Sequence, residues 1–205
     1  RRIDTNVVPG SEEKLDMLQY CVQTLTERGY VFIGMDHFAK PDDELSIALK
    51  EGFLQRNFQG YSTYADCDLV AIGVSSIGKI GSTYSQNERD IDAYYAALDA
   101  GHLPIMRGYQ LNQDDILRRN IIQDLMCRFS LDYQIYESVF GIPFSRYFAA
   151  ELEDMKQLET LGLVRLKPHS LTVTPKGRFL IRNIAMVFDY HLRHKETKAK
   201  YSQTV

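Results

Sequence analysis

Residues 30–45 read YVFIGMDHFAKPDDEL, an apolar and β-rich run that passes through a short polar loop into the start of a helix. The run over residues 30–35 predicts a strand, and residues 41–52 predict a short helix closed by a glycine. Upstream, apolar side chains recur on one helical face after Ser11, which we expect to be the N-cap. A helix, a strand and a second helix in this order are typical of α/β proteins.

A second apolar run, Leu69 to Val74, follows a polar segment over residues 53–67 that we expect to be irregular. Nearly continuous apolar runs of this length are typical of strands buried on both faces, as in parallel sheets covered by helices. Residues 87–100 then predict a helix that ends at Gly101. We therefore expect residues 1–104 to be the last β/α units of a larger sheet.

The composition changes near Pro104, and we place a domain boundary there. Residues 105–205 predict a mainly helical domain with one hairpin over residues 163–173. Helices followed by a hairpin and a last helix resemble a winged-helix module. The expected elements are helices over 113–129, 145–161 and 174–191, and strands over 163–166 and 171–173.

The charge balance excludes several classes of protein. The 205 residues carry 24 basic and 27 acidic side chains, a formal charge of −3, which weighs against a broadly basic nucleic-acid binder or a polybasic membrane anchor. No apolar run reaches 18 residues, so we expect no transmembrane helix. Cys21, Cys67 and Cys127 are too scattered for a disulfide scaffold or a metal motif, and we expect thiols in a reducing cytoplasm.

The helix before the predicted hairpin tests a DNA-binding interpretation of the second half. In a DNA-binding winged helix, this helix would enter the major groove. Residues 149–159 carry four acidic side chains against one lysine, and this charge would repel phosphate. A packing or lid role is therefore favoured, and a winged-helix binding module stays open as an alternative function.

Polar side chains after the first predicted strand are candidates for a functional site. Asp36, His37 and Lys40 follow residues 30–35, and ligands of parallel sheets bind beyond the carboxyl ends of the strands. The alternative is a capped loop that contains a hydrogen-bonded histidine. Neither a nucleophile elbow nor the spacing of a metal site accompanies these residues.

The loop after the second predicted strand is a further candidate. Residues 73–81 contain three glycines and two serines, which would let a ligand approach the backbone closely. Arg56 and Lys79 flank the two loops and can receive anionic groups. The alternatives are an ordinary tight turn and two surface cations.

Four segments together resemble the oxygen-independent coproporphyrinogen III oxidases, also called coproporphyrinogen dehydrogenases. They are residues 30–45, RNFQGY at 56–61, GVSSI at 73–77 and TPKGRFLIRNI at 174–184. The resemblance implies a radical S-adenosylmethionine enzyme of heme biosynthesis, which converts two propionates of coproporphyrinogen III to vinyl groups and gives protoporphyrinogen IX without oxygen. It also implies that residues 1–104 are the end of a partial radical-S-adenosylmethionine barrel, and that residues 105–205 form a helical carboxyl-terminal domain that helps to cover the substrate.

The same resemblance implies the cofactors. The family uses a [4Fe-4S] cluster to reduce one S-adenosylmethionine, and it holds a second S-adenosylmethionine beside the first. Phe58, Gln59 and Ile77 match positions that line the second molecule's site, so we expect Ile77 to pack against it and the other two to contact it from a loop. No catalytic residue is assigned. Four side chains stay candidates for contact with the substrate's carboxylates: Asp36, His37, Lys40 and Arg56.

One motif of the family is missing. The C-x3-C-x2-C spacing that binds the cluster does not occur in this sequence, so no metal ligand is expected in it. The resemblance therefore implies that the cluster ligands lie upstream, and that this sequence is the carboxyl-terminal portion of the enzyme, a little under half of it, which we expect to be inactive alone. The start, without Met or a signal-peptide core, is likewise what we expect of the middle of a longer chain or of a trimmed one. The parent's expected partners are coproporphyrinogen III and an electron donor, with no nucleic acid and no membrane.

A heme-chaperone branch of the same superfamily is the nearest alternative. It typically carries His-Asn with a following Tyr-Trp where this chain has residues 57–61, and the sequence contains no tryptophan. Heme or porphyrin binding without catalysis, with His37 and His191 as the first ligands to test, is therefore an alternative to the favoured oxidase.

Overall fold

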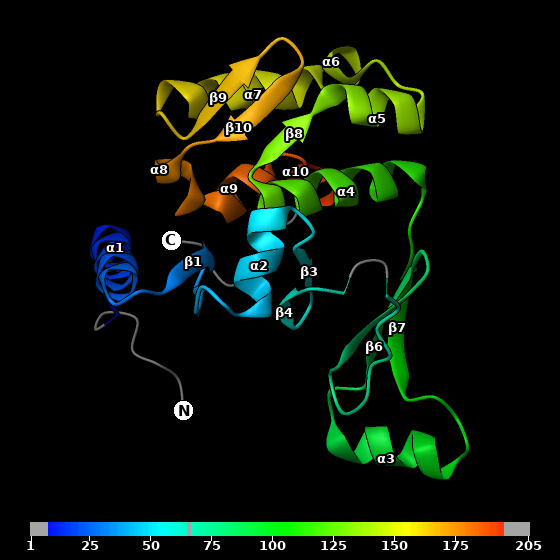
Figure 1. Cartoon of the computed structure of the whole chain (residues 1–205). Helices are drawn as coiled ribbons and strands as arrows, with labels where there is room; N and C mark the ends of the chain where they lie inside the picture. The colour runs from blue at the N-terminus through cyan, green and yellow to red at the C-terminus, as the bar shows by residue number, and fades with distance from the viewer. Residues whose placement is uncertain (1–7, 65–66, 195–205) are drawn as a thin grey trace.

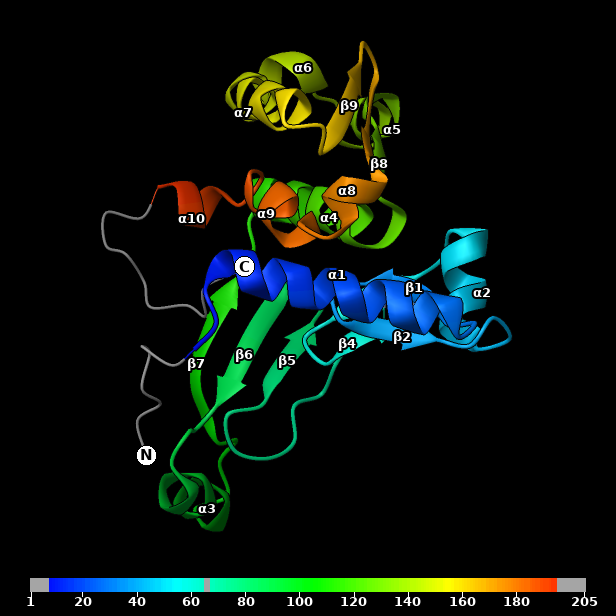
Figure 2. The same cartoon turned by 90° about the vertical axis from the view of Figure 1, so that its left-hand side faces the viewer.

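The structure, a computed structural model, describes residues 8–64 and 67–194. It begins with α1 (Ser11–Glu27), which follows Gly10 as its N-cap. Ser11 is thus the first residue of the helix, and the expectation that it caps the helix is wrong by one position. No residue of α1 is buried, and the helix lies alongside β1 (Figure 2).

The strand predicted over residues 30–35 exists as β1 (Val31–Gly34), but it lies in a hairpin and not in a parallel sheet. Its antiparallel partner is β2 (His37–Ala39), the next strand along the chain. The chain reverses between them because Gly34 and Met35 have φ values of +156° and +54°. The predicted short helix follows as α2 (Glu44–Glu51).

The strand predicted from Leu69 to Val74 is wrong. Only Leu69 forms a β-bridge, through backbone hydrogen bonds of 2.7 and 2.9 Å with Lys79, and Val70 and Ile72 are 71% and 83% exposed. The side-chain amide of Asn87 donates to two backbone carbonyl groups of this segment, at 3.3 and 3.0 Å. A side chain therefore uses the acceptors that a neighbouring strand would need.

Two antiparallel sheets between residues 55 and 110 were not expected, because their strands are short and mostly polar. They comprise a hairpin of β3 (Gln55–Asn57) and β4 (Gly60–Ser62), and a sheet of β5 (Ile77–Ile80), β6 (Thr83–Asn87) and β7 (Ile105–Gln110). The helix predicted over residues 87–100 is α3 (Ile91–Asp99), which joins β6 to β7. It begins later than predicted because Asp90 caps it with its carboxylate.

The second half contains the predicted long helix and the predicted hairpin. The helix is α4 (Gln113–Arg128), and the hairpin is β9 (Val164–Lys167) with β10 (Ser170–Val173). A further short strand, β8 (Ser130–Asp132), pairs with β10, so the sheet has the order β8-β10-β9.

Two of the predicted helices are divided. The remaining helices are α5 (Tyr133–Phe140), α6 (Phe144–Tyr147), α7 (Ala149–Thr160), α8 (Pro175–Arg178), α9 (Ile181–Met186) and α10 (Tyr190–Arg193). The helix predicted over 145–161 breaks at Phe148, where φ is −102° and ψ is 30°. The last predicted helix breaks at Leu180, which has a similar conformation, and again at Asp189, whose side chain caps α10.

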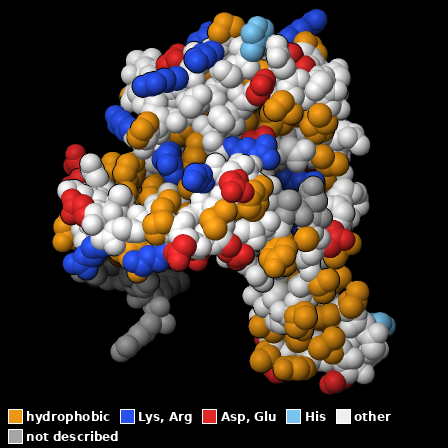
Figure 3. Space-filling model, in the orientation of Figure 1, with side chains coloured by type: hydrophobic (Ala, Val, Ile, Leu, Met, Phe, Trp, Pro, Cys, Tyr) orange, Lys and Arg blue, Asp and Glu red, His pale blue; other side chains and the backbone are white. Residues whose placement is uncertain are grey.

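These elements form layers that Figures 1 and 2 show from two directions. Helices α5–α7 and the β8-β10-β9 sheet lie on one side of α4 and α9, and the two hairpins with α2 lie on the other. The core runs through these layers, from Ile33 and Leu54 to a stack in which the rings of Tyr133 and Phe144 are 4.2 Å apart. The β5–β7 sheet and α3 form a lobe that projects from the layers, with many apolar side chains on its surface (Figure 3). Across the described ranges, no helix combines the length and the apolar character needed to cross a membrane.

Candidate functional site

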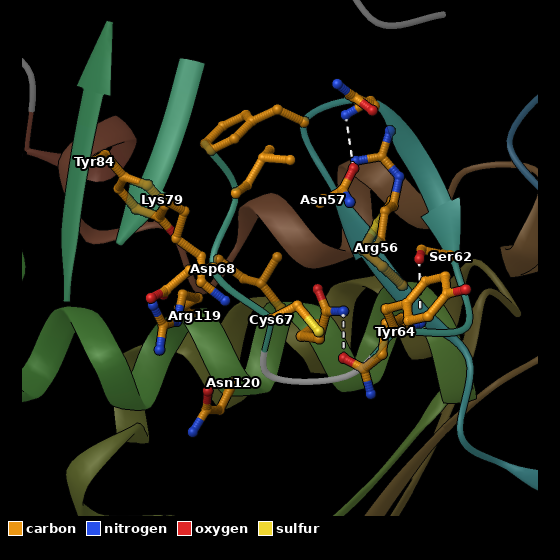
Figure 4. Close-up of a pocket in the computed structure, with 17 residues that line it drawn as sticks. Arg56, Asn57, Ser62, Tyr64, Cys67, Asp68, Lys79, Tyr84, Arg119 and Asn120 are labelled. Atoms are coloured by element: carbon orange, nitrogen blue, oxygen red, sulfur yellow. Dashed lines mark hydrogen bonds between the residues drawn. The ribbon is translucent and has the colours of Figure 1, made fainter. Parts of the chain in front are cut away.

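A cavity of about 490 Å³ lies between the β3–β4 hairpin, the β5–β6 pair and α4 (Figure 4). Its wall on α4 carries Arg119 and Ile122, and its opposite wall carries Arg56 and Phe58 of the hairpin. A cavity of this size is in the range that holds a small-molecule ligand. It is therefore the candidate site.

The β3–β4 hairpin lines one side of this cavity with both of its strands and its turn. The Asn57 side chain accepts a hydrogen bond from the Gln59 backbone N–H at 2.8 Å, which stabilises the tight turn. Phe58 at the tip is 54% exposed, and its ring meets the edge of the Tyr84 ring at 5.3 Å. Tyr61 ties the hairpin to α4 because its hydroxyl donates to the Met126 carbonyl at 3.1 Å, and burial raises the pKa of this phenol to about 12.

A smaller hollow of about 270 Å³ adjoins the cavity, and Phe58, Gln59 and Ile77 all line it. The structure thus brings together the three residues predicted to contact a cofactor. The rest of the wall is the irregular segment over residues 69–76, whose bend is held by the hydroxyl of Ser76. That hydroxyl donates to the Ile72 carbonyl at 2.7 Å. The hollow combines an aromatic ring, an aliphatic side chain, an amide and accessible backbone.

Three cations line the larger cavity: Arg56, Lys79 and Arg119. Within residues 8–64 and 67–194, none of them forms an ion pair with an acidic side chain, although Asp68 also lines the cavity. In the same part of the chain, Nε of Arg56 and Nη1 of Arg119 are buried and have no hydrogen-bond acceptor. Buried polar atoms are normally paired, so the hydrogen bonding of these two guanidinium groups is incomplete among the described residues.

The sequence gives no signal for Arg119, because Arg118 beside it and the acids within one helical turn are typical of a solvated, ion-paired helix face. Arg118 is paired, at 2.7 Å with Asp114 and 2.8 Å with Glu151, but it is buried. The acid one helical turn before Arg119 is Asp115. Its carboxylate is already bound by the Asn112 N–H, the Tyr109 hydroxyl and the His191 ring, which leaves Arg119 without it.

The polar residues after β1 lie outside both cavities. The ring of His37 stands with Nδ1 2.8 Å from Asp36 and edge-on to Tyr61 at 5.1 Å, and Lys40 lies over the Tyr30 ring at 3.9 Å. His37 also packs so closely on Gly60 that a Cβ there would be 2.9 Å from Nε2. The structure therefore supports a loop histidine packed among its neighbours, although its Nδ1 makes no hydrogen bond with the described residues. Of Asp36, His37, Lys40 and Arg56, only Arg56 lines the cavity.

The described residues do not fit an iron–sulfur cluster. They contain no group of three or more His, Cys, Asp or Glu side chains arranged to hold a metal ion. Cys21 and Cys67 are separate and exposed, and Cys127 is buried. Burial raises the pKa of the Cys127 thiol to about 12, which opposes the thiolate that such a cluster needs.

Comparison with protein families and known sequences gives consistent matches. The HemN C-terminal domain family matches residues 111–180. An oxygen-independent coproporphyrinogen III oxidase of Synechocystis is 46% identical over 209 residues, which cover 100% of this chain and 45% of the relative. The enzyme of the same name in Pseudomonas aeruginosa is 48% identical over 192 residues, which cover 94% of this chain and 42% of the relative.

A solved structure gives the same result. The Escherichia coli coproporphyrinogen III oxidase (HemN), described as a radical SAM enzyme, superposes with a TM-score of 0.87 at 46% identity, over 93% of this chain and 44% of that one. The chain thus spans less than half the length of these relatives. These matches favour the oxidase interpretation over the binding-module and heme-chaperone alternatives. By sequence and by structure, this chain is homologous along nearly its whole length to the carboxyl-terminal part of the oxygen-independent coproporphyrinogen III oxidases.

Proposed function

We propose that this chain is the carboxyl-terminal portion of a radical S-adenosylmethionine enzyme that decarboxylates two propionates of coproporphyrinogen III to vinyl groups, giving protoporphyrinogen IX. The proposal rests on one observation: Phe58, Gln59 and Ile77 line the same hollow, which adjoins a cavity lined by cationic side chains. Homology at 43–48% identity with enzymes of this name supports the substrate. The residues described here would complete a site whose cluster ligands lie elsewhere in the parent enzyme.

The smaller hollow suits S-adenosylmethionine in its chemistry. The Phe58 ring offers a flat apolar surface to a base, Ile77 offers aliphatic packing, and the Gln59 amide offers both a donor and an acceptor. When bound to a [4Fe-4S] cluster elsewhere in the parent, this class of cofactor supplies an organic radical that abstracts hydrogen. The role of this chain in that chemistry is to hold a second cofactor molecule and to exclude water around it.

The second half of the chain would act as a cover. We assign residues 1–104 to the end of the partial barrel and residues 105–205 to a winged-helix-like domain, in which α7 and the β9–β10 hairpin pack together. β7, the first strand after this boundary, nevertheless pairs with β6 of the first part. A DNA-reading role is not proposed, because α7 offers no free basic side chain to phosphate: its one lysine, Lys156, pairs with Glu153 at 2.6 Å, and its other acidic side chains are engaged within the protein. Glu151 pairs with Arg118, Asp154 pairs with Arg193 at 2.8 Å, and Glu159 accepts from a β9 backbone N–H.

The exposed thiols are consistent with a reducing cytoplasm, and the electron donor would be a partner of the parent.

The test is a charge placed in the smaller hollow of the parent enzyme. Ile77→Asp should lower anaerobic turnover of coproporphyrinogen III at least 10-fold and leave the cluster's absorption spectrum unchanged, because a carboxylate there disrupts apolar packing against the cofactor. Ile80→Asp is the matched control, since Ile80 is the last residue of the same strand and is 51% exposed. Equal turnover in the two variants would remove Ile77 from the site.

A further inference from the structure

The larger cavity carries more positive charge than the described residues around it neutralise. Arg56 on β3, Lys79 on β5 and Arg119 on α4 all face it, and each comes from a different element. Figure 4 shows Lys79 and Arg119 toward one side and Arg56 toward the other. Cations placed by three separate elements and spread over two walls suit a ligand that bears more than one anionic group.

The two arginines lack ion-pair partners and have incomplete hydrogen bonding among the described residues. The buried Nε of Arg56 and the buried Nη1 of Arg119 donate to no protein atom among residues 8–64 and 67–194. A guanidinium group binds a carboxylate through two parallel hydrogen bonds, so a ligand carboxylate would bind each arginine through the guanidinium atoms that line the cavity. Asp68 is the acid of the cavity, and it accepts a hydrogen bond from the Gly81 N–H at 2.7 Å.

The remaining walls suit the uncharged part of a porphyrinogen. Phe58, Ile122 and Met126 give the cavity an apolar surface between its cationic sides. The cavity also shares Phe58, Gln59 and Leu69 with the smaller hollow, so a ligand in it would lie against the proposed cofactor. The position therefore fits the substrate of the proposed reaction.

We infer that Arg56, Lys79 and Arg119 form a carboxylate subsite for the two propionates that the substrate keeps. The inference rests on the proposed function and deepens it. In the reaction, a propionate side chain loses a hydrogen atom to the organic radical, then its carboxylate as neutral CO2 and one electron to an acceptor. Cations clamped on that carboxylate would stabilise the charged ground state and raise the barrier. A propionate that stays charged throughout can be held tightly at no such cost.

The experiment is a binding study on the parent enzyme with two stable porphyrins. Coproporphyrin III carries four propionates, and protoporphyrin IX carries only the retained pair. Arg119→Gln and Arg56→Gln should each lower the affinity for both porphyrins by the same factor, roughly 10-fold or more. Fluorescence titration would measure these affinities. Arg119→Lys, which keeps the charge, should recover part of the affinity and shows that the Gln effect is not loss of folding. Arg165→Gln on the distant β9 strand is the matched control and should change neither.

S-adenosylmethionine also carries a carboxylate, on its methionyl group, and could be the ligand of these cations instead. It is therefore tested as a second ligand. Its affinity, measured by calorimetry, should be unchanged in the arginine variants. Weaker binding of coproporphyrin III alone would assign the cations to the reacting pair. Weaker binding of S-adenosylmethionine alone would assign them to the cofactor. Unchanged affinity for all three ligands would show that the cations bind no carboxylate of these molecules. Each of these results overturns the inference. Turnover by the unmodified parent is scored separately, so a failure of the proposed reaction is not confused with a failure of the subsite.

Discussion

Replacing Arg118 with methionine should lower the free energy of unfolding by about 3–5 kcal/mol, because it removes one partner of a buried ion pair. Its Nη1 lies 2.8 Å from Glu151 and donates to the Phe188 carbonyl at 3.2 Å, and the side chains of the pair are only 11% and 7% exposed. Asp114, 2.7 Å from Nε, is 27% exposed and can regain water. The main cost is therefore the buried Glu151 carboxylate left without its cation.

A double-mutant cycle checks this reasoning. Glu151→Leu alone leaves Arg118 paired with Asp114 and should cost less than Arg118→Met. The double variant buries no unpaired charge, so its loss should fall short of the sum of the single losses by at least about 1 kcal/mol. Urea unfolding followed by circular dichroism gives the free energies. A loss below about 1 kcal/mol for Arg118→Met, or strictly additive losses, would refute the account of this pair.

Three further predictions follow from buried or crowded groups. Gly177→Ala should destabilise the chain by about 2 kcal/mol or more, because its Cβ would overlap the Leu163 carbonyl. Gly10→Ala meets nothing within 4 Å and should cost less, only the loss of a favourable N-cap residue of α1; thermal unfolding compares the two variants. Ellman's reagent at pH 8 should react rapidly with Cys21 and Cys67 but not with the buried, high-pKa Cys127, and rapid reaction of a third thiol would show that the α4 packing is wrong. For Asp115, burial would raise the pKa, but hydrogen bonds from Asn112, His191 and Tyr109 outweigh it and lower the pKa. Its stabilising contribution is therefore complete above the ordinary carboxyl pKa of about 4 and is lost as the pH falls through the lowered folded-state pKa. Asp115→Asn should therefore make the free energy of unfolding fall less steeply as the pH is lowered. An unchanged slope would contradict the hydrogen-bond network around Asp115.

The sequence predicted the helical half of the fold better than the first half, for physical reasons. The helix over 113–128 has strong signals, an Asn112 cap and acids in its first turn, and the β9–β10 hairpin is a pair of β-rich runs around a short turn. The run from Leu69 to Val74 has the composition of a buried strand. Asn87, which is distant in the sequence, binds its carbonyl groups, and no local pattern shows this.

The candidate site was only partly accessible to sequence reasoning. Phe58, Gln59 and Ile77 were expected to act together because of a family resemblance, and the structure places them around one hollow. Arg119 was missed because i, i+4 spacing pairs it with Asp115, while the structure gives Asp115 to His191 and Tyr109. Which of several nearby groups an acidic side chain binds depends on tertiary contacts. The division of the chain at residues 102–110 stays a prediction.

The most direct test of the central claim is the product formed by the parent enzyme. Under anaerobic conditions with a one-electron donor and S-adenosylmethionine, the account predicts that coproporphyrinogen III gives protoporphyrinogen IX, with two molecules of CO2 released for each product. Chromatography of the oxidised porphyrins and trapping of labelled CO2 would measure both. Stoichiometric binding of heme or porphyrin with no vinyl product and no CO2 would contradict the account and favour a carrier of heme.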